Sequence, residues 1–528
     1  MIDIVLSERD FDYEIQALVT GFFPAEHNRV VILEKQDENS LKALAQTDAD
    51  AALFVGAFFG QDKITVWLLN GGKYCERSVT VSGEQDFHKH VDKTTHPYRT
   101  DYKNKLKKLL FTILCEMEEE TLPEGMLRSI PVWGTMTGVR PTKIPMNRLL
   151  QNEPLDTVRR SMKEEYCCSP EKAELCLDIA AREAALLQKA EYDKGYSLYV
   201  GIPFCPSTCL YCSFPSYPME QFGSLIPDYL EALKREIRFC GELQKGKKLT
   251  SVYIGGGTPT TLSAEQLEEL LICLYENFPV QDAYEITVEA GRPDSITREK
   301  LMALRRFGVE RISVNPQTMQ DKTLQSIGRQ HTVAQTKQVF ALARECGFDN
   351  INMDLIIGLP GETPEDFADT LAQMKALDPD SVTIHSLVVK RASRLRRLLD
   401  EGAVPEEERA RRMEQMMQMG LAFARKNGYQ PYYMYRQKNT AGYAGSSGQE
   451  NIGFAREGKE CLYNILIMEE KQTIVACGAG ASTKRVWTEP NPDGTHRIER
   501  CENVKDVAQY IARIDEMIQR KQQLFSEE

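Results

Sequence analysis

The sequence has no long apolar run and no excess of positive charge. No stretch approaches the ~18 consecutive apolar residues that a membrane-spanning helix requires. The first residues, MIDIVLSERDFDYE, are acidic and lack the apolar core and cleavage site of a secretory signal. We therefore expect a cytoplasmic protein without a membrane span. The net charge of −12 argues against a general nucleic-acid binder, although a local basic pocket for a small anion stays compatible with it.

The composition is otherwise that of a folded protein of two to four domains. Apolar residues make up 42% and charged residues 27% of the 528 positions, which is the balance of ordinary globular proteins. The 14 cysteines suit reduced thiols and a metal site better than a disulfide framework, because the chain is long and has no export signal.

Three of these cysteines lie in the most distinctive stretch, YVGIPFCPSTCLYCSF, at residues 199–214. Cys205, Cys209 and Cys212 are spaced C-x3-C-x2-C. A strand-type run at 197–201 precedes them, and two prolines keep the next residues out of regular structure. The cysteines are thus predicted on a loop past the carboxyl end of a strand, where α/β enzymes place reactive groups. Such a loop could hold zinc, a redox pair, or three irons of a cubane cluster with the fourth iron open.

Strand and helix patterns alternate after this loop. Six β/α units in about 190 residues predict an α/β fold with a parallel sheet curled into a partial (β/α)6 TIM-like barrel. An open barrel of this kind leaves a wide lateral mouth for a bulky substrate. The strand-type runs are 197–201, 250–255, 284–289, 310–315, 350–357 and 381–387.

We expect two further regions around this barrel. Residues 1–190 are predicted to form an α+β extension with a helical linker, in which 70–72, Asn-Gly-Gly, marks a hairpin. The barrel is assigned to 191–395. Residues 396–528 are predicted to form a C-terminal mixed α/β domain that covers the substrate, with a long helix at 405–427.

Polar or glycine-rich segments end several of the predicted strands. Parallel strands meet at their carboxyl ends, so these groups are expected to converge on the cysteine loop, which favours an open-iron cluster over zinc or a redox pair. His385 is equally well explained as a structural polar group. The glycines after the second strand allow backbone groups to approach a ligand closely. The residues at strand ends are Gly255, Gly256, Gly257, Thr258, Glu289, Asn315, Gln317 and His385; Asp354 lies within the fifth predicted strand, and Arg329 lies in the loop at 328–331.

Taken together, these motifs resemble the radical S-adenosylmethionine enzymes. Within them the chain resembles the oxygen-independent coproporphyrinogen III oxidase family, and in particular its long-form branch called coproporphyrinogen dehydrogenase. The resemblance begins at about Tyr199 and continues through the last glycine-rich element. The motifs that carry it are YVGIPFCPSTCLYCSF, GGGTPT, TVEAG, RISVNPQT, SIGRQH and NMDLIIGLPGET, with WGTMTGVRPTK and PYYMYRQKN for the long-form branch.

The resemblance implies a [4Fe–4S] cluster bound by Cys205, Cys209 and Cys212, whose open iron would chelate S-adenosylmethionine. One electron passed to the sulfonium would then give a 5′-deoxyadenosyl radical. Tyr199, Glu289 and Gln317 are the candidate catalytic residues. The implied cofactor-binding residues are Tyr199, Tyr211, Gly256, Gly257, Thr258, Glu289, Gln317, Arg329, Asp354 and Val388.

The implied reaction is the oxidative decarboxylation of coproporphyrinogen III propionates to vinyl groups, a step of porphyrin and haem biosynthesis. Reduced flavodoxin or ferredoxin would be the electron donor. Two alternatives stay open: a haem-binding chaperone for haem trafficking, and a radical enzyme that degrades haem by methyl transfer. RNA modification is disfavoured by the acidic charge.

A tetracarboxylate with a broad ring face needs cations and flat side chains around it. Two stretches of the sequence could provide them. For the first, the cation-rich stretch after the sixth predicted strand, a solvated helix face is an equally good interpretation. The two stretches are Lys390, Arg391, Arg394, Arg396 and Arg397, and Tyr432, Tyr433, Tyr435, Arg436 and Lys438.

The chain departs from better-known members of the family at two places. Gly201 stands where those members have a histidine, and Ser213 with Phe214 stands where a further cysteine follows the motif. The cluster needs neither residue, so we expect cofactor cleavage to survive. These two departures instead bear on whether the substrate is converted.

Overall fold

The computed structural model divides the chain into two compact units. Unit 1 comprises Met1–Leu177, Arg436–Ser447 and Pro490–Thr495, and unit 2 comprises the remaining residues. The domain boundaries expected at 190 and 395 stay predictions. The residues that the structure describes are 1–33, 38–39, 53–60, 62–70, 73–81, 99–119, 122–212, 216–388, 395, 405–437, 450–490 and 496–526.

Unit 1 contains a five-stranded sheet in the order β2–β1–β3–β4–β5. β1 pairs in parallel with β2 and β3, and the other pairs are antiparallel. Asn70 at the end of β4 faces Lys73 at the start of β5, which confirms the predicted hairpin; Gly71 and Gly72 lie outside the described residues. The strands are β1 (Ile2–Leu6), β2 (Asn28–Ile32), β3 (Leu53–Phe59), β4 (Lys63–Asn70) and β5 (Lys73–Thr80).

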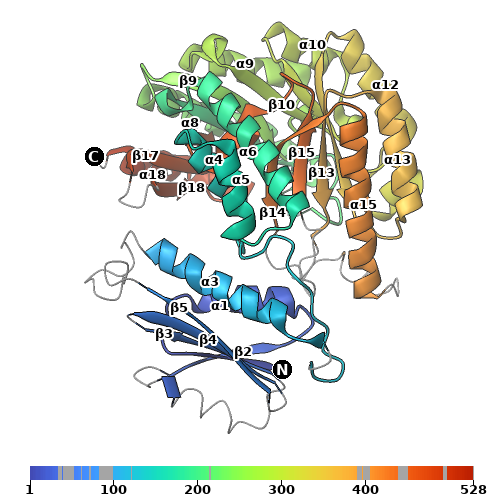
Figure 1. The fold of residues 1–528 in the computed structure, drawn as a ribbon. Coiled ribbons are helices and arrows are strands. Elements are labelled where there is room, and N and C mark those ends of the chain that lie inside the picture. Colours follow the sequence, from blue (N-terminus) through green and yellow to red (C-terminus); the bar gives the residue numbers. More distant parts are fainter. Residues whose placement is uncertain are drawn as a thin grey trace. The chain divides into compact units, whose positions relative to one another are not determined.

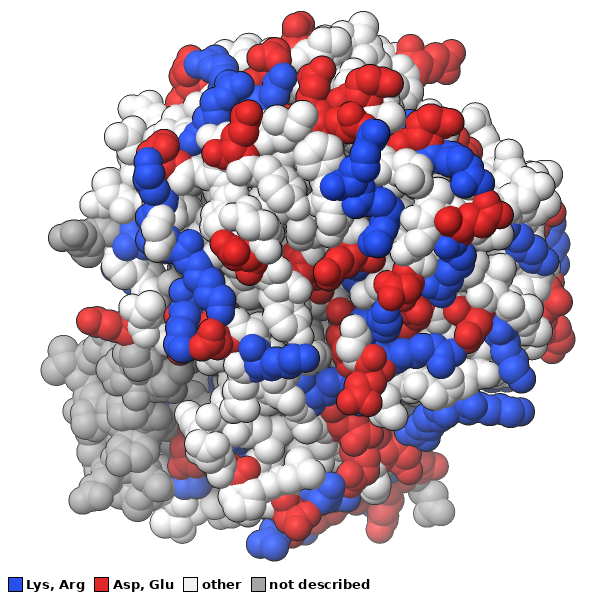
Figure 2. Space-filling view, turned by 90° about the horizontal axis from the view of Figure 1, so that it is seen from above, with Lys and Arg blue, Asp and Glu red and all other residues white. Residues whose placement is uncertain are grey.

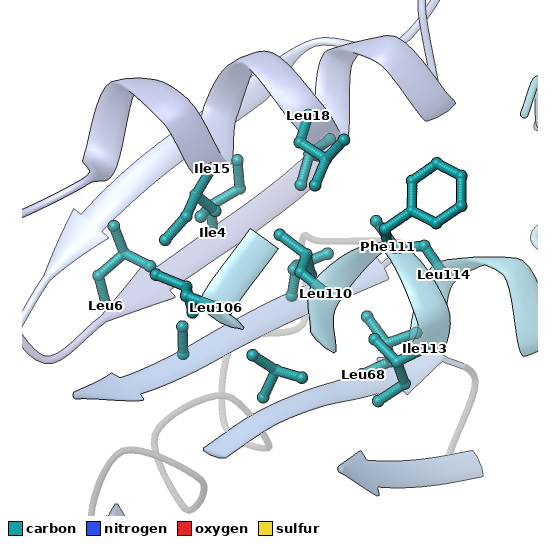
Figure 3. Packing of buried hydrophobic residues seen from close by; sticks show 14 of the residues in the cluster. Ile4, Leu6, Ile15, Leu18, Leu68, Leu106, Leu110, Phe111, Ile113 and Leu114 are labelled. Atoms are coloured by element: carbon teal, nitrogen blue, oxygen red, sulfur yellow. The ribbon is translucent and has the colours of Figure 1, made fainter. Parts of the chain in front are cut away.

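Two helices, α1 (Asp12–Phe22) and α3 (Arg99–Glu116), pack their apolar faces on this sheet. Figure 3 shows the resulting core, in which side chains of β1 (Ile4), α1 (Ile15 and Leu18) and α3 (Leu110) belong to one cluster. Alternate strand positions and every third or fourth helix position point inward. Each fully buried aliphatic side chain contributes roughly 1.5–3 kcal/mol, so this packing stabilises the extension as an α+β unit. Three further helices follow, α4 (Lys143–Leu150), α5 (Leu155–Glu164) and α6 (Pro170–Ala190).

Unit 2 is built around an 11-stranded sheet in the order β14–β15–β13–β12–β11–β10–β9–β6–β16–β17–β18 (Figure 1). Its six central strands are parallel neighbours, which confirms the six predicted β/α units. The strands are β6 (Gly195–Ile202), β9 (Lys248–Gly256), β10 (Glu285–Gly291), β11 (Arg311–Val314), β12 (Asn350–Ile357) and β13 (Ser381–Ser386). The longer connecting helices are α8 (Ile226–Leu243), α9 (Ala264–Asn277), α10 (Arg298–Arg306), α12 (Val333–Glu345) and α13 (Pro364–Leu377).

Three of these helices begin with a reciprocal capping box. Ser263, Thr332 and Thr363 each accept a hydrogen bond from the backbone N–H three residues later, and the side chain there accepts one back. An N-cap of this type contributes about 1 kcal/mol. The caps therefore fix where α9, α12 and α13 begin and limit the length of the loops that precede them.

Strands from the C-terminal part of the chain extend this sheet on both sides. β16 (Thr473–Cys477) lies parallel to β6, and β15 (Glu450–Ala455) lies antiparallel to β13. Only the last glycine-rich element of the sequence was expected here, because the four apolar residues 474–477 have too little periodicity to identify a buried strand. The described strands run from β14 at one edge to β18 at the other and form an open, partial barrel. The other elements are β14 (Gln430–Arg436), β17 (Ser482–Pro490), β18 (His496–Glu502), α15 (Glu406–Lys426), α16 (Leu462–Glu469), α17 (Val507–Ala512) and α18 (Ile514–Ser526).

The surface carries charges of both signs. Figure 2 shows one face, on which Lys and Arg side chains are interspersed with Asp and Glu. Pairs along and between helices, such as Lys234 with Glu231 and Lys322 with Asp366, show how such charges neutralise one another locally.

Within the described ranges, no helix has both the length and the hydropathy needed to cross a membrane.

Candidate active site at the carboxyl ends of the parallel strands

The cysteine loop follows β6 directly, as predicted. Cys205 ends the two-residue strand β7 (Phe204–Cys205), which pairs with β8 (Tyr217–Pro218). Cys205 is buried, whereas Cys209 and Cys212 are half-buried. The Cys212 N–H donates to the Cys209 carbonyl over 3.1 Å, so the backbone turns tightly between these two residues. Ser213 and Phe214 lie outside the described residues.

The glycine segment after β9 packs on this loop through its backbone. The Gly257 N–H donates to Ile202 O and the Thr258 N–H to Phe204 O, both over 2.7 Å. The Thr258 hydroxyl donates to the Cys205 sulfur over 3.5 Å. A Cβ on Gly257 would lie 2.6 Å from Phe204 O, so only glycine permits this approach. The two predicted motifs therefore form one structure.

Behind the glycines lies a stack of three tyrosines. Tyr199 of β6 stacks 6.3 Å from Tyr253 of β9, and Tyr253 stacks 4.4 Å from Tyr463 at the start of α16. The Tyr253 hydroxyl donates a short hydrogen bond to Glu289 at the end of β10. Gly256 has a φ of 108°, and a Cβ there would lie 3.2 Å from the Tyr199 hydroxyl. Tyr199, Gly256 and Glu289 are thus neighbours, as expected.

The environment of Glu289 favours its protonated form. Burial, helped by the nearby Asp354 carboxylate, outweighs the opposing hydrogen bonds from Tyr253 and Gly256 and raises the pKa of this carboxyl to about 7. Glu289 can therefore either donate or accept a proton near neutral pH. It can also offer both kinds of hydrogen bond to a bound ligand.

Residues from the fourth, fifth and sixth parallel strands meet in one hydrogen-bonded group. Gln317 lies three residues past β11, and Asp354 lies inside β12. Gln317 has a φ of 69°; its N–H donates to Asp354 O over 2.9 Å, and its carbonyl accepts from Ile356 over 2.8 Å. A non-glycine residue in this conformation is uncommon and is held here by both bonds. The Asp354 N–H donates to Asn315 Oδ1 over 3.2 Å, and His385 Nε2 lies 3.8 Å from Asp354 Oδ1. Burial acts to raise the pKa of Asp354, but hydrogen bonds led by His385 outweigh it and lower this pKa.

Arg329 connects this group with the cysteine loop. Its Nε donates to the Tyr211 hydroxyl over 3.2 Å, and its Nη1 donates to Asn315 O over 2.5 Å. Arg329 is buried. Burial raises the pKa of Tyr211 above its ordinary range, so the phenol stays neutral. The cysteine loop and the ends of the parallel strands thus form one continuous site.

The candidate substrate residues are less well connected to this site. Val388, which the resemblance implies as a cofactor-binding residue, lies half-buried two residues past β13, and its role stays a prediction. Tyr432 and Tyr433 are buried in β14, and Arg436 donates instead to Met136 O over 2.6 Å. The residues of this set outside the described ranges are Lys390, Arg391, Arg394, Arg396, Arg397 and Lys438.

Sequence reasoning missed Tyr253, Tyr463 and Arg292. The register pairs Tyr199 with Tyr253 and Tyr253 with Thr287, so period-2 alternation from Glu289 could have placed Tyr253 on the interior face. Arg292 lies three residues after Glu289, and its Nη1 lies 3.9 Å from the Cys209 sulfur. The sequence carries no local signal for Tyr463, because only the tertiary fold brings α16 beneath the strands.

The residues around the cysteines fit an iron–sulfur cluster. Among the described residues, no three His, Cys, Asp or Glu side chains converge on a single ion. A cubane does not require such convergence, because each thiolate binds a different iron. The three sulfurs share one loop, and a guanidinium and a hydroxyl approach two of them. This donor set suits a cluster with three protein ligands.

Comparison with known proteins identifies the class to which this site belongs. Residues 199–374 match the family model of the radical SAM superfamily. The matched range begins at Tyr199 and includes the cysteine loop, the glycine segment and the ends of the first five parallel strands, whereas β13 lies beyond it. Proteins of this superfamily use a [4Fe–4S] cluster and S-adenosylmethionine, and these are the cofactors of this chain.

Individual relatives define the family within this class. The chain is 40% identical over 401 residues to the oxygen-independent coproporphyrinogen-III oxidase-like protein HemZ of Bacillus subtilis, with 74% of this chain and 77% of the relative covered. It belongs to the oxygen-independent coproporphyrinogen III oxidase family. It is also 32% identical to the haem chaperone HemW of Bacillus subtilis, with 54% of this chain and 70% of the relative covered.

A solved structure supports the same assignment. The coproporphyrinogen III oxidase HemN from Escherichia coli, a radical SAM enzyme, superposes with a TM-score of 0.50 at 27% identity. The match covers 63% of this chain and 73% of that protein. The likeness therefore extends well beyond the residues of the superfamily model.

Proposed function

We propose that this protein catalyses the oxygen-independent oxidative decarboxylation of coproporphyrinogen III, converting propionate side chains to vinyl groups. The observation that carries the proposal is the 40% identity, over 74% of the chain, to a protein described as oxidase-like. The likeness to the Escherichia coli oxidase supports it. The cysteine loop at the ends of the parallel strands provides the site at which the chemistry would occur.

Each part of this site would have a defined task. The bound cluster and S-adenosylmethionine together supply a radical that abstracts hydrogen. Because the N–H groups of Gly257 and Thr258 are bonded to the cysteine loop, we expect the carbonyl oxygens of the glycine segment to accept hydrogen bonds from the cofactor's amino group. Glu289 and Gln317 would hold the ribose and carboxylate, and Tyr199 would flank the cluster.

The proposed reaction fixes the redox partners by class. A propionate that becomes a vinyl group loses one hydrogen atom, one carbon dioxide and one electron. The reaction therefore requires a low-potential donor to start cofactor cleavage and an acceptor for the released electron. Reduced flavodoxin or ferredoxin is the proposed donor, and a cytoplasmic location is proposed with it.

A second candidate function is haem binding without decarboxylation. It is favoured by relatives named as haem chaperones, which are 31–34% identical to this chain. Gly201, which stands where better-known members of the family have a histidine, also bears on whether this protein converts its substrate. A Cβ at Gly201 would lie 3.4 Å from the Tyr199 ring, so the backbone leaves room for a side chain that this protein does not have.

One experiment separates the two functions. The protein is reconstituted with iron and sulfide and incubated anaerobically with a reductant and S-adenosylmethionine, with either coproporphyrinogen III or haem. We expect mass spectrometry to show decarboxylated porphyrinogen in step with cofactor consumption. Stoichiometric haem binding with a Soret shift and no new product would favour the chaperone, and a methylated or opened tetrapyrrole would favour haem degradation.

A cysteine variant tests the cluster assignment in the same assay. Cys209→Ala should lose the full cubane and cofactor cleavage, because the loop then offers two thiolates. Cys75→Ala is the matched control, since Cys75 is a half-buried free thiol in β5 of unit 1. A Cys209→Ala protein that still cleaved the cofactor with a complete cluster would refute the assignment.

A further inference from the structure

Arg292 reaches from the end of the third parallel strand into the cysteine loop. It follows β10 directly and is buried. Its Nη1 donates to the Ser207 hydroxyl over 2.7 Å and to the Ser207 carbonyl over 3.0 Å. The same nitrogen lies 3.9 Å from the Cys209 sulfur. One guanidinium nitrogen therefore contacts the loop between the first two cysteines at three atoms.

The other side of the guanidinium is held by Asp294. Arg292 Nε donates to Asp294 Oδ1 over 3.0 Å, and Nη2 donates to Oδ2 over 2.5 Å. The Ser295 hydroxyl donates to the Arg292 carbonyl over 2.8 Å and fixes the backbone of the turn. This bidentate arrangement uses the planar fork of arginine, which a lysine cannot reproduce. The charge beside Cys209 is therefore placed in advance, with its counter-charge on the far side.

We infer that Arg292 and Asp294 form a positioning pair that holds the cysteine loop at Ser207 and sets the reduction potential of the cluster bound through Cys209. The inference deepens the proposed function and rests on it only for the presence of the cluster. Cluster potentials depend on local charge and on hydrogen bonds to the sulfurs. In a buried site of low effective dielectric, a nearby positive charge stabilises the reduced, more negative cluster, and a carboxylate opposes it.

The two members of the pair should shift the potential in opposite directions. Arg292→Gln removes the positive charge and should lower the potential, whereas Asp294→Asn removes the negative charge and should raise it. A tenfold change in the equilibrium constant for one-electron reduction, about 59 mV, is the expected scale for each variant. Arg298→Gln is the matched control, because Arg298 is exposed and paired with Glu345 on the surface.

The measurement is a potentiometric titration of the reconstituted protein, followed by electron paramagnetic resonance without substrate. Opposite shifts in the two variants, with none in Arg298→Gln, would establish the inference. Shifts of the same sign, or unchanged potentials in both, would show a purely structural ion pair and overturn it. If Arg292→Gln does not retain iron, Arg292→Lys keeps the charge without the fork, and Asp294→Asn must still raise the potential.

These readouts are independent of decarboxylation. A wild-type protein that binds the cluster but does not convert coproporphyrinogen would defeat the proposed reaction and leave the potential test intact. A wild-type protein that binds no cluster would defeat both.

Discussion

At the scale of single residues, two glycines beside the cysteine loop differ in what a methyl group would meet. A Cβ on Gly257 would lie 2.6 Å from Phe204 O and 2.8 Å from the Pro203 carbonyl carbon, both of which belong to the loop backbone. The nearest neighbours of a Cβ on Gly201 would be the Tyr199 ring at 3.4 Å, the Cys477 carbonyl oxygen at 3.5 Å and the Ala479 carbonyl oxygen at 3.8 Å, all ordinary contact distances. The first glycine is required by packing, and the second is not.

Gly257→Ala should therefore destabilise the protein by roughly 1–3 kcal/mol, the usual range for overpacking, and should reduce iron retention after reconstitution. Gly201→Ala should change the free energy of unfolding by less than about 1 kcal/mol and keep the full iron content. Denaturation of the apoprotein and iron analysis check both variants. Equal losses in the two proteins would contradict the packing described for the glycine segment.

Glu362 makes folding stability depend on pH. It is buried after β12, where the Thr318 hydroxyl donates a short hydrogen bond to it. Burial raises the pKa of this carboxyl from 4.5 to about 7. The folded state therefore holds a proton that the unfolded state releases. The resulting stabilisation is complete below about pH 4.5 and is lost as the pH rises through 7.

Glu362→Gln should remove this pH dependence, because glutamine stays neutral. At pH 8 the variant should exceed the wild type in free energy of unfolding by up to about 3 kcal/mol, and near pH 4 the two should be similar. Urea denaturation across this range measures the difference. Glu365→Gln, an exposed position in the first turn of α13, serves as the control and should follow the wild type from pH 5 to 8.

At the scale of secondary-structure elements, a buried charge network joins the C-terminal helices to the sheet. Glu236 of α8 accepts from Lys521 Nζ of α18 over 2.7 Å, from the Tyr510 hydroxyl of α17 over 2.5 Å, and from the Gly478 N–H over 2.8 Å. A Cβ on Gly478 would lie 2.6 Å from Gly201 O. The network therefore holds the turn after β16 against the end of β6, just before the cysteine loop.

Lys521→Met should destabilise the protein by about 3–5 kcal/mol, because it leaves the Glu236 carboxylate buried without its cation. The double variant Glu236→Gln with Lys521→Met should lose less than the sum of the single losses, since the pair acts as a unit. Chemical denaturation of the four proteins in this cycle gives the coupling energy. Strict additivity would show that the two side chains do not depend on each other.

The elements differ in how far the sequence alone could predict them. The six parallel strands were predictable because each is an apolar run that ends at glycine or polar residues, and because helices of fitting length, several of them capped, lie between these runs. β16 was not predictable, because its four apolar residues, 474–477, are too few to show a period. The ion pair between Glu236 and Lys521 could not be predicted either. The two residues are 285 positions apart in the sequence, and no local pattern around either one indicates that its charge is buried.

At the candidate site, the residues at strand ends could be predicted and their supports could not. Cys205, Thr258 and Glu289 occupy motif positions whose neighbours follow from parallel strand order. Period-2 alternation indicates the face of Tyr253, but its closeness to Glu289 depends on the register of β9 and β10, and the contacts of Arg292 depend on the turn after β10. Val388 stays a prediction, and the cation-rich stretch after it lies outside the described residues.

At the scale of the whole molecule, the radical SAM barrel is one of two compact units. Unit 1 has its own sheet and apolar core, whereas the catalytic candidates all belong to unit 2. The relative at 40% identity is matched over more residues than the superfamily model covers. The family assignment thus rests on residues beyond the cofactor site.

The central claim is that the radical formed at the cysteine loop takes hydrogen from a propionate side chain of coproporphyrinogen III. Its most direct test is anaerobic turnover with coproporphyrinogen III deuterated in the propionate chains, read by mass spectrometry of the nucleoside product. The claim predicts deuterium in 5′-deoxyadenosine in step with formation of vinyl groups. Unlabelled 5′-deoxyadenosine with intact porphyrinogen would contradict it.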